Sequence, residues 1–217
     1  MAAIFTGIVQ GVRPVTRLER REGTSALTVG LGDLADGLRI GGSVSVNGCC
    51  LTAVDVAGGE VRFDLVRETL DNTNLGGLDV GSGVNVERSF RVGDEVGGHI
   101  LSGHIASTVS VTDVLKKPGH QRIAASVPDP WMRYLTDKGF VALNGASLTI
   151  ADIDRDNGTI AVSLIPETLA RTNFDEVEVG HRLNLEVDAR TQAVVDTVQR
   201  MLPELVRGQS EGTLGRV

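Results

Sequence analysis

The sequence contains little cysteine: Cys49 and Cys50 are the only two among 217 residues, and they are neighbours. Adjacent residues of a strand point to opposite faces, so a disulfide between these two would be strained. A disulfide scaffold and a thiolate metal cluster are therefore excluded. The chain also has only four histidines, scattered without paired spacing, and we expect no metal site.

Long apolar runs are absent as well. No stretch approaches the roughly 20 residues of a transmembrane helix, and the N-terminus lacks the basic and apolar segments of a signal peptide. We therefore expect no membrane partner. A reducing cytoplasm, in which two free cysteines persist, is the predicted compartment.

Basic charge is in short supply too, because 21 Lys and Arg stand against 28 Asp and Glu, a net charge of −7. Non-specific nucleic-acid binding depends on Lys and Arg, so we expect no nucleic-acid partner. The one basic cluster, Arg17 to Arg21, is interrupted by acidic residues and is interpreted as a solvated face. No phosphate-binding glycine loop, nucleophile elbow or dinucleotide fingerprint occurs in a strand-to-helix context, which argues against phosphoryl and hydride transfer.

What the sequence does contain is an internal repeat. Residues 47–52 (NGCCLT) align with 144–149 (NGASLT), 68–70 with 167–169 (both ETL), 84–87 (VNVE) with 183–186 (LNLE), and 5–7 (FTG) with 101–103 (LSG). The offset between these pairs stays between 96 and 99 residues. Matching segments kept in order at a nearly constant offset indicate a tandem duplication.

Each half shows the period-2 alternation of half-buried strands, at 43–46, 83–87, 148–153 and 182–187. Glycine-rich breaks such as 57–59, and the Asn157-Gly158 pair, suit tight hairpin turns. Many short strands predict a barrel or a sandwich in each half, and we favour barrels because closure leaves no exposed edge. The expected domains are residues 1–99 and 100–189.

The end of the chain changes period. From Thr191 to Leu202 the apolar residues recur every three or four positions, which predicts an amphipathic helix over 190–206 that Pro203 should end or kink. Its apolar stripe could pack on its own barrel or on another subunit, and we favour an oligomerisation helix. Residues 207–217 are expected to form a frayed tail.

Two positions differ between the halves in a way that suggests chemistry. Cys50 aligns with Ser147, and His104 aligns with Ile8. Cys50 is either a nucleophile or a small buried residue, and His104 either transfers protons or is structural. Leu51 should point into its barrel while Cys50 and its neighbours line a groove, although a plain hairpin turn explains the motif equally well. His99 is expected to be structural, and His120 and His181 to lie in surface loops.

Together these residues resemble the riboflavin synthase family. The match covers nearly the whole chain as ordered motifs: 5–9 (FTGIV), 47–52, 64–70 (DLVRETL), 73–75 (TNL), 84–88 (VNVER), 97–99 (GGH), 102–105 (SGHI), 138–140 (KGF), 147–149 (SLT), 165–169 (IPETL), 184–188 (NLEVD) and 191–196 (TQAVVD). The resemblance implies an all-β fold of two similar six-stranded antiparallel Greek-key barrels plus a C-terminal α-helix, assembled as a homotrimer. It also suggests lumazine synthase as a partner.

The resemblance further implies a transferase. Two molecules of 6,7-dimethyl-8-ribityllumazine dismutate as one passes a four-carbon unit to the other, giving riboflavin and 5-amino-6-(D-ribitylamino)uracil, with no metal or redox cofactor. Two copies of one ligand must then be held face to face, which two copies of one binding fold achieve directly. The family implies that this pocket lies between subunits.

By resemblance, Ser43, Cys50 and His104 are the catalytic candidates, with His104 shuttling protons while Cys50 and Ser43 position or activate the nucleophile. The implied groups around the ligand rings are Ser43, Cys50, Thr52, Phe5, His104, Lys138, Ser147, Thr149 and Asp188. Further implied substrate-binding residues are Gly7, Ile8, Val9, Leu51, Gly103, Ile105 and Leu148. The implied ribityl pockets are Asp64, Leu65, Val66, Arg67, Glu68 and Thr69, and Ser163, Leu164, Ile165, Pro166, Glu167 and Thr168. Family members commonly begin with Met directly before Phe, whereas Ala2-Ala3-Ile4 intervene here.

Two other functions fit the same pattern. A relative of this family has kept the barrels and lost catalysis, so a lumazine or flavin carrier is the first alternative. The joint presence of Ser43, Cys50 and His104 argues against it. A structural trimer is the second, and only the terminal helix favours it.

Overall fold

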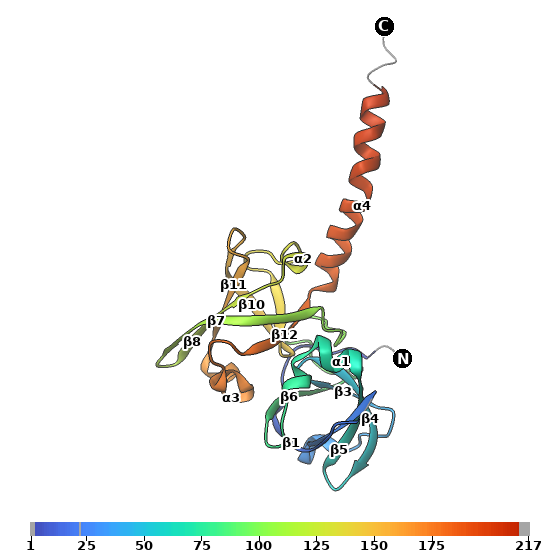
Figure 1. Cartoon of the computed structure of the whole chain (residues 1–217), viewed down its shortest axis with the longest axis vertical. Helices are drawn as coiled ribbons and strands as arrows, with labels where there is room; N and C mark the ends of the chain where they lie inside the picture. The colour runs from blue at the N-terminus through green and yellow to red at the C-terminus, as the bar shows by residue number, and fades with distance from the viewer. Residues whose placement is uncertain (1–2, 22, 213–217) are drawn as a thin grey trace.

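The first six strands close into a barrel in the computed structural model, which describes residues 3–21 and 23–212, with side chains up to residue 202 (Figure 1). The strands are β1 (Gly11–Glu19), β2 (Thr24–Gly30), β3 (Ser43–Val46), β4 (Cys49–Ala57), β5 (Glu60–Val66) and β6 (Gly83–Arg88). Around the barrel they follow the order β1-β2-β5-β4-β3-β6. Strand β2 thus lies beside β5 rather than β3, which is a Greek-key arrangement.

The second barrel repeats the first strand for strand. Its strands are β7 (Ser107–Lys117), β8 (His120–Ser126), β9 (Phe140–Leu143), β10 (Ala146–Asp154), β11 (Thr159–Leu164) and β12 (Arg182–Val187). Their circular order, β10-β11-β8-β7-β12-β9, is the same when β7 is matched to β1 and so on. The predicted duplication and the two six-stranded antiparallel barrels are confirmed.

Short helices occupy equivalent places in the two halves. The first half has η1 (Gly32–Ala35), α1 (Arg67–Asn72) and η2 (Asn74–Gly77), and the second has α2 (Asp129–Met132), α3 (Pro166–Arg171) and η3 (Asn173–Glu176). Helices α1 and α3 follow directly on β5 and β11. They arise where the alternating pattern of those strands stops, at the Glu-Thr-Leu segments shared by both halves.

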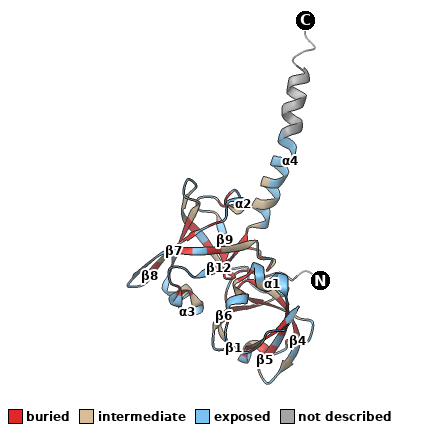
Figure 2. Ribbon diagram, in the orientation of Figure 1, coloured by how far each residue is buried: buried red, intermediate tan, exposed pale blue. Residues whose placement is uncertain are grey.

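Alternation decides what each barrel encloses. Along β5, Val61, Phe63 and Leu65 are buried while the residues between them are exposed, as a closed small barrel requires (Figure 2). Each barrel has its own apolar core. The register shifts between Ala53 and Asp55, and at the equivalent place in β10, where bulges help the sheet to curl.

The two barrels meet at their Asn-Gly turns. Asn47 and Asn144 have φ of 45° and 44°, the left-handed backbone of a tight primed turn. The tight turn predicted at Asn157 is wrong: Asn157 is not left-handed and lies in a longer turn, residues 155–158. Gly48 and Gly145 lie against each other: a Cβ on Gly48 would stand 2.7 Å from the nitrogen of Gly145. The Asn side chains reach across the junction, and Asn184 Nδ2 donates to the Asn47 carbonyl at 2.8 Å. The motif therefore joins the barrels as well as turning the chain.

The segments that precede the two barrels exchange places; we call residues 5–9 and 101–105 the crossing segments. Phe5 and Leu101 pair as an antiparallel bridge, with N–H···O distances of 2.9 and 3.0 Å. Val9, which precedes the first barrel, is buried in the core of the second. Ile105, which precedes the second barrel, packs against the core of the first. Each half therefore places its leading segment on the other barrel.

Helix α4 (Ala189–Gly212) projects away from the second barrel (Figure 1). The helix continues through Pro203, where the sequence predicted an end or a kink, and into the stretch expected to fray; residues 213–217 lie outside the described part. A proline removes one backbone hydrogen bond, which a long helix can tolerate. In residues 3–21 and 23–212, no helix is long and apolar enough to cross a membrane.

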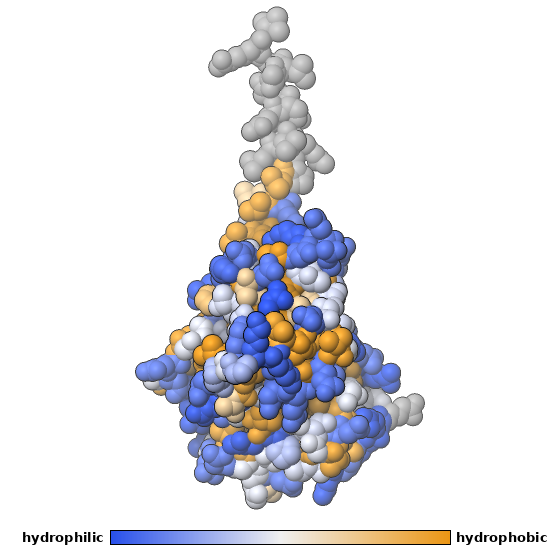
Figure 3. All heavy atoms as spheres, turned by 90° about the vertical axis from the view of Figure 1, so that its left-hand side faces the viewer, coloured by the Kyte–Doolittle hydropathy of each residue, from blue (hydrophilic) through white to orange (hydrophobic). Residues whose placement is uncertain are grey.

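One side of α4 is held on its own barrel. Val195 packs against the second core, and the Tyr134 hydroxyl donates to Asp196 at 2.6 Å. The rest of the predicted stripe is exposed in the single chain: Val194, Val198, Met201 and Leu202. Hydrophobic residues are visible on the stretch of the helix nearest the barrels in Figure 3.

Candidate functional site

The crossing segments place a glycine of each half against the chemistry-bearing strand of the other. Cys50 N donates to the Gly103 carbonyl at 2.9 Å, and Ser147 N donates to the Gly7 carbonyl at 2.8 Å. Both glycines have φ of +74°. A Cβ on Gly103 would stand 2.5 Å from the Cys50 Cβ, which no side chain can occupy. Close approach and left-handed backbone together require glycine here.

The first site lies on the first barrel, around Cys50. Ser43 faces Thr52 across the β3–β4 pair, and Ser45 faces Cys50. Cys50 is half-buried, whereas Leu51 is buried in the barrel, as its alternation predicted. His104 is exposed on the crossing segment, one residue beyond the glycine that covers Cys50. The backbone thus brings His104 next to the strand pair that carries Ser43 and Cys50, the other two catalytic candidates.

The Cys50 thiol is not activated in the free protein. Burial raises its pKa above the ordinary value, a hydrogen bond from Ser43 opposes this, and the charge of Glu186 adds to the increase. Burial likewise raises the pKa of Cys49 to about 12, consistent with its place inside the barrel. Cys50 is therefore a neutral thiol near pH 7, suited to donating a hydrogen bond or proton rather than to attacking as a thiolate.

The second site is a pocket of about 500 Å³ on the second barrel. It is lined by Gly7, Ile8, Val9, Gln10, Ala146, Ser147, Ile165, Glu167, Thr168, Arg171 and Thr172. A crossing segment, the start of β10 and helix α3 therefore form its walls. By the internal repeat, the equivalent walls of the first site are Gly103 to Ala106, Cys49 to Cys50, and Val66 to Thr73.

His99 supports the second site from a buried position beside Ser147, which is compatible with the structural role that the sequence suggested. Its Nδ1 lies 2.6 Å from the Ser147 Oγ, and its ring stacks on Phe140 at 5.1 Å between centroids. Burial lowers its pKa, so the ring is neutral near pH 7. Its Nε2 has no hydrogen-bond partner among the described residues. The alignment of the halves carried the signal, because His99 stands where the first half has Ala3.

Several expected ligand residues have other surroundings. Phe5 is 1% exposed, in a small apolar cluster between the barrels that Cys50 packs against, so its ring does not face solvent. Lys138 Nζ donates to the Ala151 carbonyl at 2.8 Å. Asp188 accepts from Thr191 N and Oγ1 at the start of α4. Burial alone would raise the pKa of Asp188, but those bonds and the charge of His99 lower it.

The two expected ribityl segments alternate between inside and outside. Leu65 and Leu164, like Leu51 and Leu148 of the other substrate-binding residues, are buried in the barrel cores. The exposed residues of these segments are Asp64, Val66, Arg67 and Glu68 in the first half, and Ser163, Ile165, Pro166 and Glu167 in the second; Thr69 and Thr168 are half-buried. Thr52 and Thr149 are exposed on the neighbouring strands. Only these outward side chains are available to a ligand.

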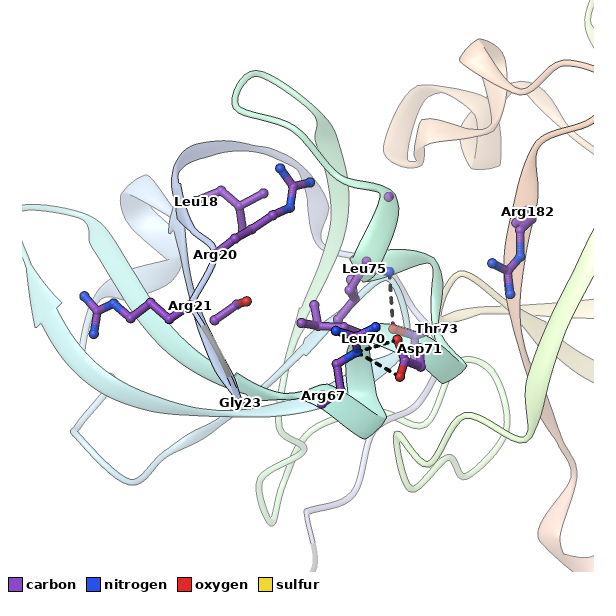
Figure 4. A pocket seen from close by; sticks show the side chains of 13 residues that line it. Leu18, Arg20, Arg21, Gly23, Arg67, Leu70, Asp71, Thr73, Leu75 and Arg182 are labelled. Atoms are coloured by element: carbon purple, nitrogen blue, oxygen red, sulfur yellow. Dashed lines mark hydrogen bonds and ion pairs between the residues drawn. The ribbon is translucent and has the colours of Figure 1, made fainter.

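Arg67 lines another pocket, of about 490 Å³, together with residues of β1, β2 and η2 (Figure 4). Its guanidinium pairs with Asp71 at 2.9 Å along the helix. Arg20 donates to the Leu78 carbonyl, and Arg182 donates to the Thr108 hydroxyl. Arg17, Arg20 and Arg21 are exposed, as predicted for the solvated basic cluster. In the described part of the chain, no group of three or more His, Cys, Asp or Glu is arranged to hold a metal ion.

Comparison with known proteins agrees with this geometry. The family model described as the lumazine binding domain matches twice, over residues 6–89 and 102–188. The structure superposes on LumP complexed with riboflavin with a TM-score of 0.79 and 25% identity, covering 85% of this chain and 99% of that one. LumP complexed with 6,7-dimethyl-8-(1'-D-ribityl) lumazine gives a TM-score of 0.77 at 25% identity, with the same coverage.

Curated relatives are more similar in sequence. The riboflavin synthase of Escherichia coli (strain K12) is 45% identical over 92% of this chain and 93% of its own length. The riboflavin synthase of Buchnera aphidicola subsp. Schizaphis graminum is 41% identical over 92% and 96%, and that of Chlamydia muridarum is 37% identical over 94% and 99%. With two lumazine-binding domains in tandem and relatives this close over almost all of its length, the chain belongs to the riboflavin synthase family.

Proposed function

We propose that this chain is a riboflavin synthase, a transferase that dismutates two molecules of 6,7-dimethyl-8-ribityllumazine into riboflavin and 5-amino-6-(D-ribitylamino)uracil. The observation that carries the proposal is the pair of lumazine-binding domains, equivalent in fold and unequal in chemistry, in a chain 45% identical to a riboflavin synthase. Because the leading segments cross, one site offers Cys50 and His104 where the other offers Ser147 and Ile8.

Two sites of the same fold suit a reaction between two identical molecules. The products together contain the atoms of the two substrates, so the transfer is balanced without an added oxidant or reductant. Binding both reactants supplies the orientation that a bimolecular step lacks. The ring methyl group of one lumazine is acidic, so a base must remove a proton from one molecule while a nucleophile adds to the other.

We assign the proton transfer to His104 and the positioning of the nucleophile to Cys50 and Ser43. His104 is the exposed imidazole of the first site, free to meet a ligand. Ser43 hydrogen-bonds Cys50, whose protonated thiol is available as a donor. In the second site His99 holds the Ser147 hydroxyl in place through its Nδ1. We assign binding rather than reaction to the remaining side chains that line the second site.

We further propose a homotrimer in the cytoplasm, with the reacting pocket formed between subunits. Supporting this, α4 leaves Val194, Val198, Met201 and Leu202 at least 49% exposed in the single chain. In oligomers whose subunits pack through helices, an exposed apolar stripe of this kind is buried by a neighbouring subunit. Lumazine synthase, which would supply the substrate, is proposed as a partner. If a dilution series that dissociates the oligomer left specific activity constant, the intersubunit pocket would be refuted.

One assay tests the activity and its alternatives. Purified chain is mixed with 6,7-dimethyl-8-ribityllumazine, without any cofactor, and riboflavin fluorescence is followed with time. Riboflavin formation is the expected result. Tight binding without conversion would instead identify a carrier, and neither binding nor conversion would leave a structural protein.

A further inference from the structure

Two buried carboxylates occupy equivalent positions near the junction of the barrels. Glu87 lies on β6 and Glu186 on β12, and each is 5% exposed. Neither forms an ion pair with a described residue. Burying a carboxylate without a cation is unfavourable unless hydrogen bonds replace water, so each must be held by donors.

The donors come from the crossing segments. Glu186 Oε1 accepts from Ser102 N at 2.7 Å and from Ser102 Oγ at 2.8 Å, and Oε2 accepts from Gly103 N at 3.1 Å. Glu87 accepts the same three bonds from Thr6 and Gly7, at 2.6, 2.8 and 3.0 Å. Each carboxylate therefore fixes one crossing segment at the point where it meets the other barrel.

What the two segments carry is different. Beyond Ser102 and Gly103 comes His104, whose N–H donates to the Ser102 hydroxyl at 3.3 Å. The Gly103 carbonyl accepts from Cys50 N. Glu186 on the second barrel thus connects to both titratable groups of the first site. The segment held by Glu87 carries Ile8, which has no group that titrates.

We propose that Glu186 is a positioning residue for the first site: from the opposite barrel it holds Gly103 against Cys50 and fixes the turn that presents His104 to the ligand. The first site is therefore completed by a residue of the second domain. The expected effect on turnover rests on the proposed function. The role of Glu186 in placing Cys50 and His104 does not depend on that function.

Electrostatics agree with the geometry. Burial raises the pKa of Glu186, while the bonds from Ser102 and Gly103 and the charge of His104 lower it. The charge of Glu186 in turn adds to the effect of burial in raising the pKa of Cys50 and of Cys49. The carboxylate therefore interacts with both groups of the first site and helps to keep the thiol protonated.

The test compares Glu186→Gln with Glu87→Gln, its matched control. Glutamine keeps the shape but replaces one acceptor oxygen with a donor, so each variant loses part of an identical set of three bonds. In both, Cys49 is first replaced by alanine, the residue that the second half has at Ala146, so that Cys50 is the only thiol. The pH dependence of alkylation of Cys50 by iodoacetamide is then measured alongside kcat, KM and thermal unfolding.

We expect Glu186→Gln to move the alkylation profile of Cys50 to lower pH, because a negative charge is removed, and to reduce kcat by about 10- to 100-fold. Glu87→Gln should leave the alkylation profile in place and act mainly on KM, since its segment carries only Ile8. Equal effects of the two variants on alkylation and on kcat would overturn the proposal and reduce both residues to structural supports.

Two further variants keep the test decisive if Glu186→Gln does not fold. Ser102→Ala removes the hydroxyl between Glu186 and the His104 N–H, and Thr6→Ala is its counterpart in the other segment. Ser102→Ala should change the pH profile of kcat, and Thr6→Ala should not. A changed profile in Thr6→Ala with an unchanged one in Ser102→Ala would refute the proposal. If the wild-type chain made no riboflavin and Glu186→Gln still shifted the alkylation of Cys50, the proposed function would fail while the role of Glu186 stood.

Discussion

The close approach of Gly103 to Cys50 leads to a quantitative prediction for Gly103→Ala. A Cβ at this position would lie 2.5 Å from the Cys50 Cβ and 2.9 Å from its nitrogen. The left-handed backbone, with φ of +74°, costs a non-glycine residue about 1–2 kcal/mol. Relieving the overlap should cost a further ~1–3 kcal/mol, typical of overpacking. We expect the free energy of unfolding to fall by about 2–5 kcal/mol.

A second glycine separates the cost of the overlap with Cys50 from the cost of the left-handed backbone. Gly37 has φ of +67°, and an added Cβ there meets nothing within 4 Å. Gly37→Ala should therefore lose only the backbone part, about 1–2 kcal/mol. Urea denaturation of both variants, followed by far-ultraviolet circular dichroism, measures the difference. Gly7→Ala, with its Cβ placed 2.5 Å from the Ser147 Cβ, should match Gly103→Ala in stability.

Turnover should separate the two crossing segments. Gly103→Ala should push the segment that carries His104 away from Cys50. Riboflavin formation should then fall by at least about 10²-fold, the rate loss typical of a catalytic group misplaced by about 1 Å. If Gly103→Ala were no less stable than Gly37→Ala, the segment would not approach Cys50 as described. Unaltered turnover in a destabilised Gly103→Ala would instead remove the first site from the reaction.

The other predictions concern single groups. His104→Gln should reduce kcat by about 10²–10⁴-fold, and if both it and Cys50→Ser kept turnover within about threefold of wild type, their assigned roles would be wrong. Because burial raises the pKa of Glu87 and Glu186 above the ordinary 4.5, the folded chain takes up these protons first as pH falls. Their contribution to the free energy of unfolding should therefore rise as pH falls through the raised pKa values, level off below the ordinary value, and be lost as pH rises again. Urea titrations of wild type and of the double glutamine variant between about pH 7.5 and about pH 4 measure this contribution. A contribution that decreases as pH falls would contradict the prediction. Val198→Asp should dissociate the oligomer in light scattering while leaving the circular dichroism spectrum of the barrels unchanged, and an unaltered mass would refute assembly through α4.

Local patterns predicted part of the barrels, because the alternation of apolar residues in four of the strands is visible in the sequence itself. The alternation at 43–46, 83–87, 148–153 and 182–187 became β3, β6, β10 and β12. The sequence motifs repeated in both halves predicted one shared topology, and the order of the strands around the two barrels confirms this prediction. The helix runs past the predicted end at residue 206 because Pro203 removes only one backbone hydrogen bond, which does not end a 24-residue helix.

The site was only partly predictable for a different reason. In the sequence, Val9 belongs to the first half and Ile105 to the second, but in the structure each packs on the other barrel. The alternation of apolar residues gives no information about which barrel a leading segment packs on. The same exchange brings Glu186 to the first site from the far end of the chain. Long-range placement of this kind depends on the junction of the barrels, which no local pattern describes.

The exchange also decides how the differences between the halves are distributed. If each leading segment stayed on its own barrel, Cys50 would share a site with Ile8, and Ser147 with His104. Crossing instead puts the thiol and the exposed imidazole of His104 in one site, and leaves the other with a hydroxyl and the buried, neutral ring of His99. Two identical ligands would therefore meet different proton donors and acceptors. Unequal surroundings suit a transfer between identical molecules, because one site can favour loss of a proton while the other favours attack on its ligand.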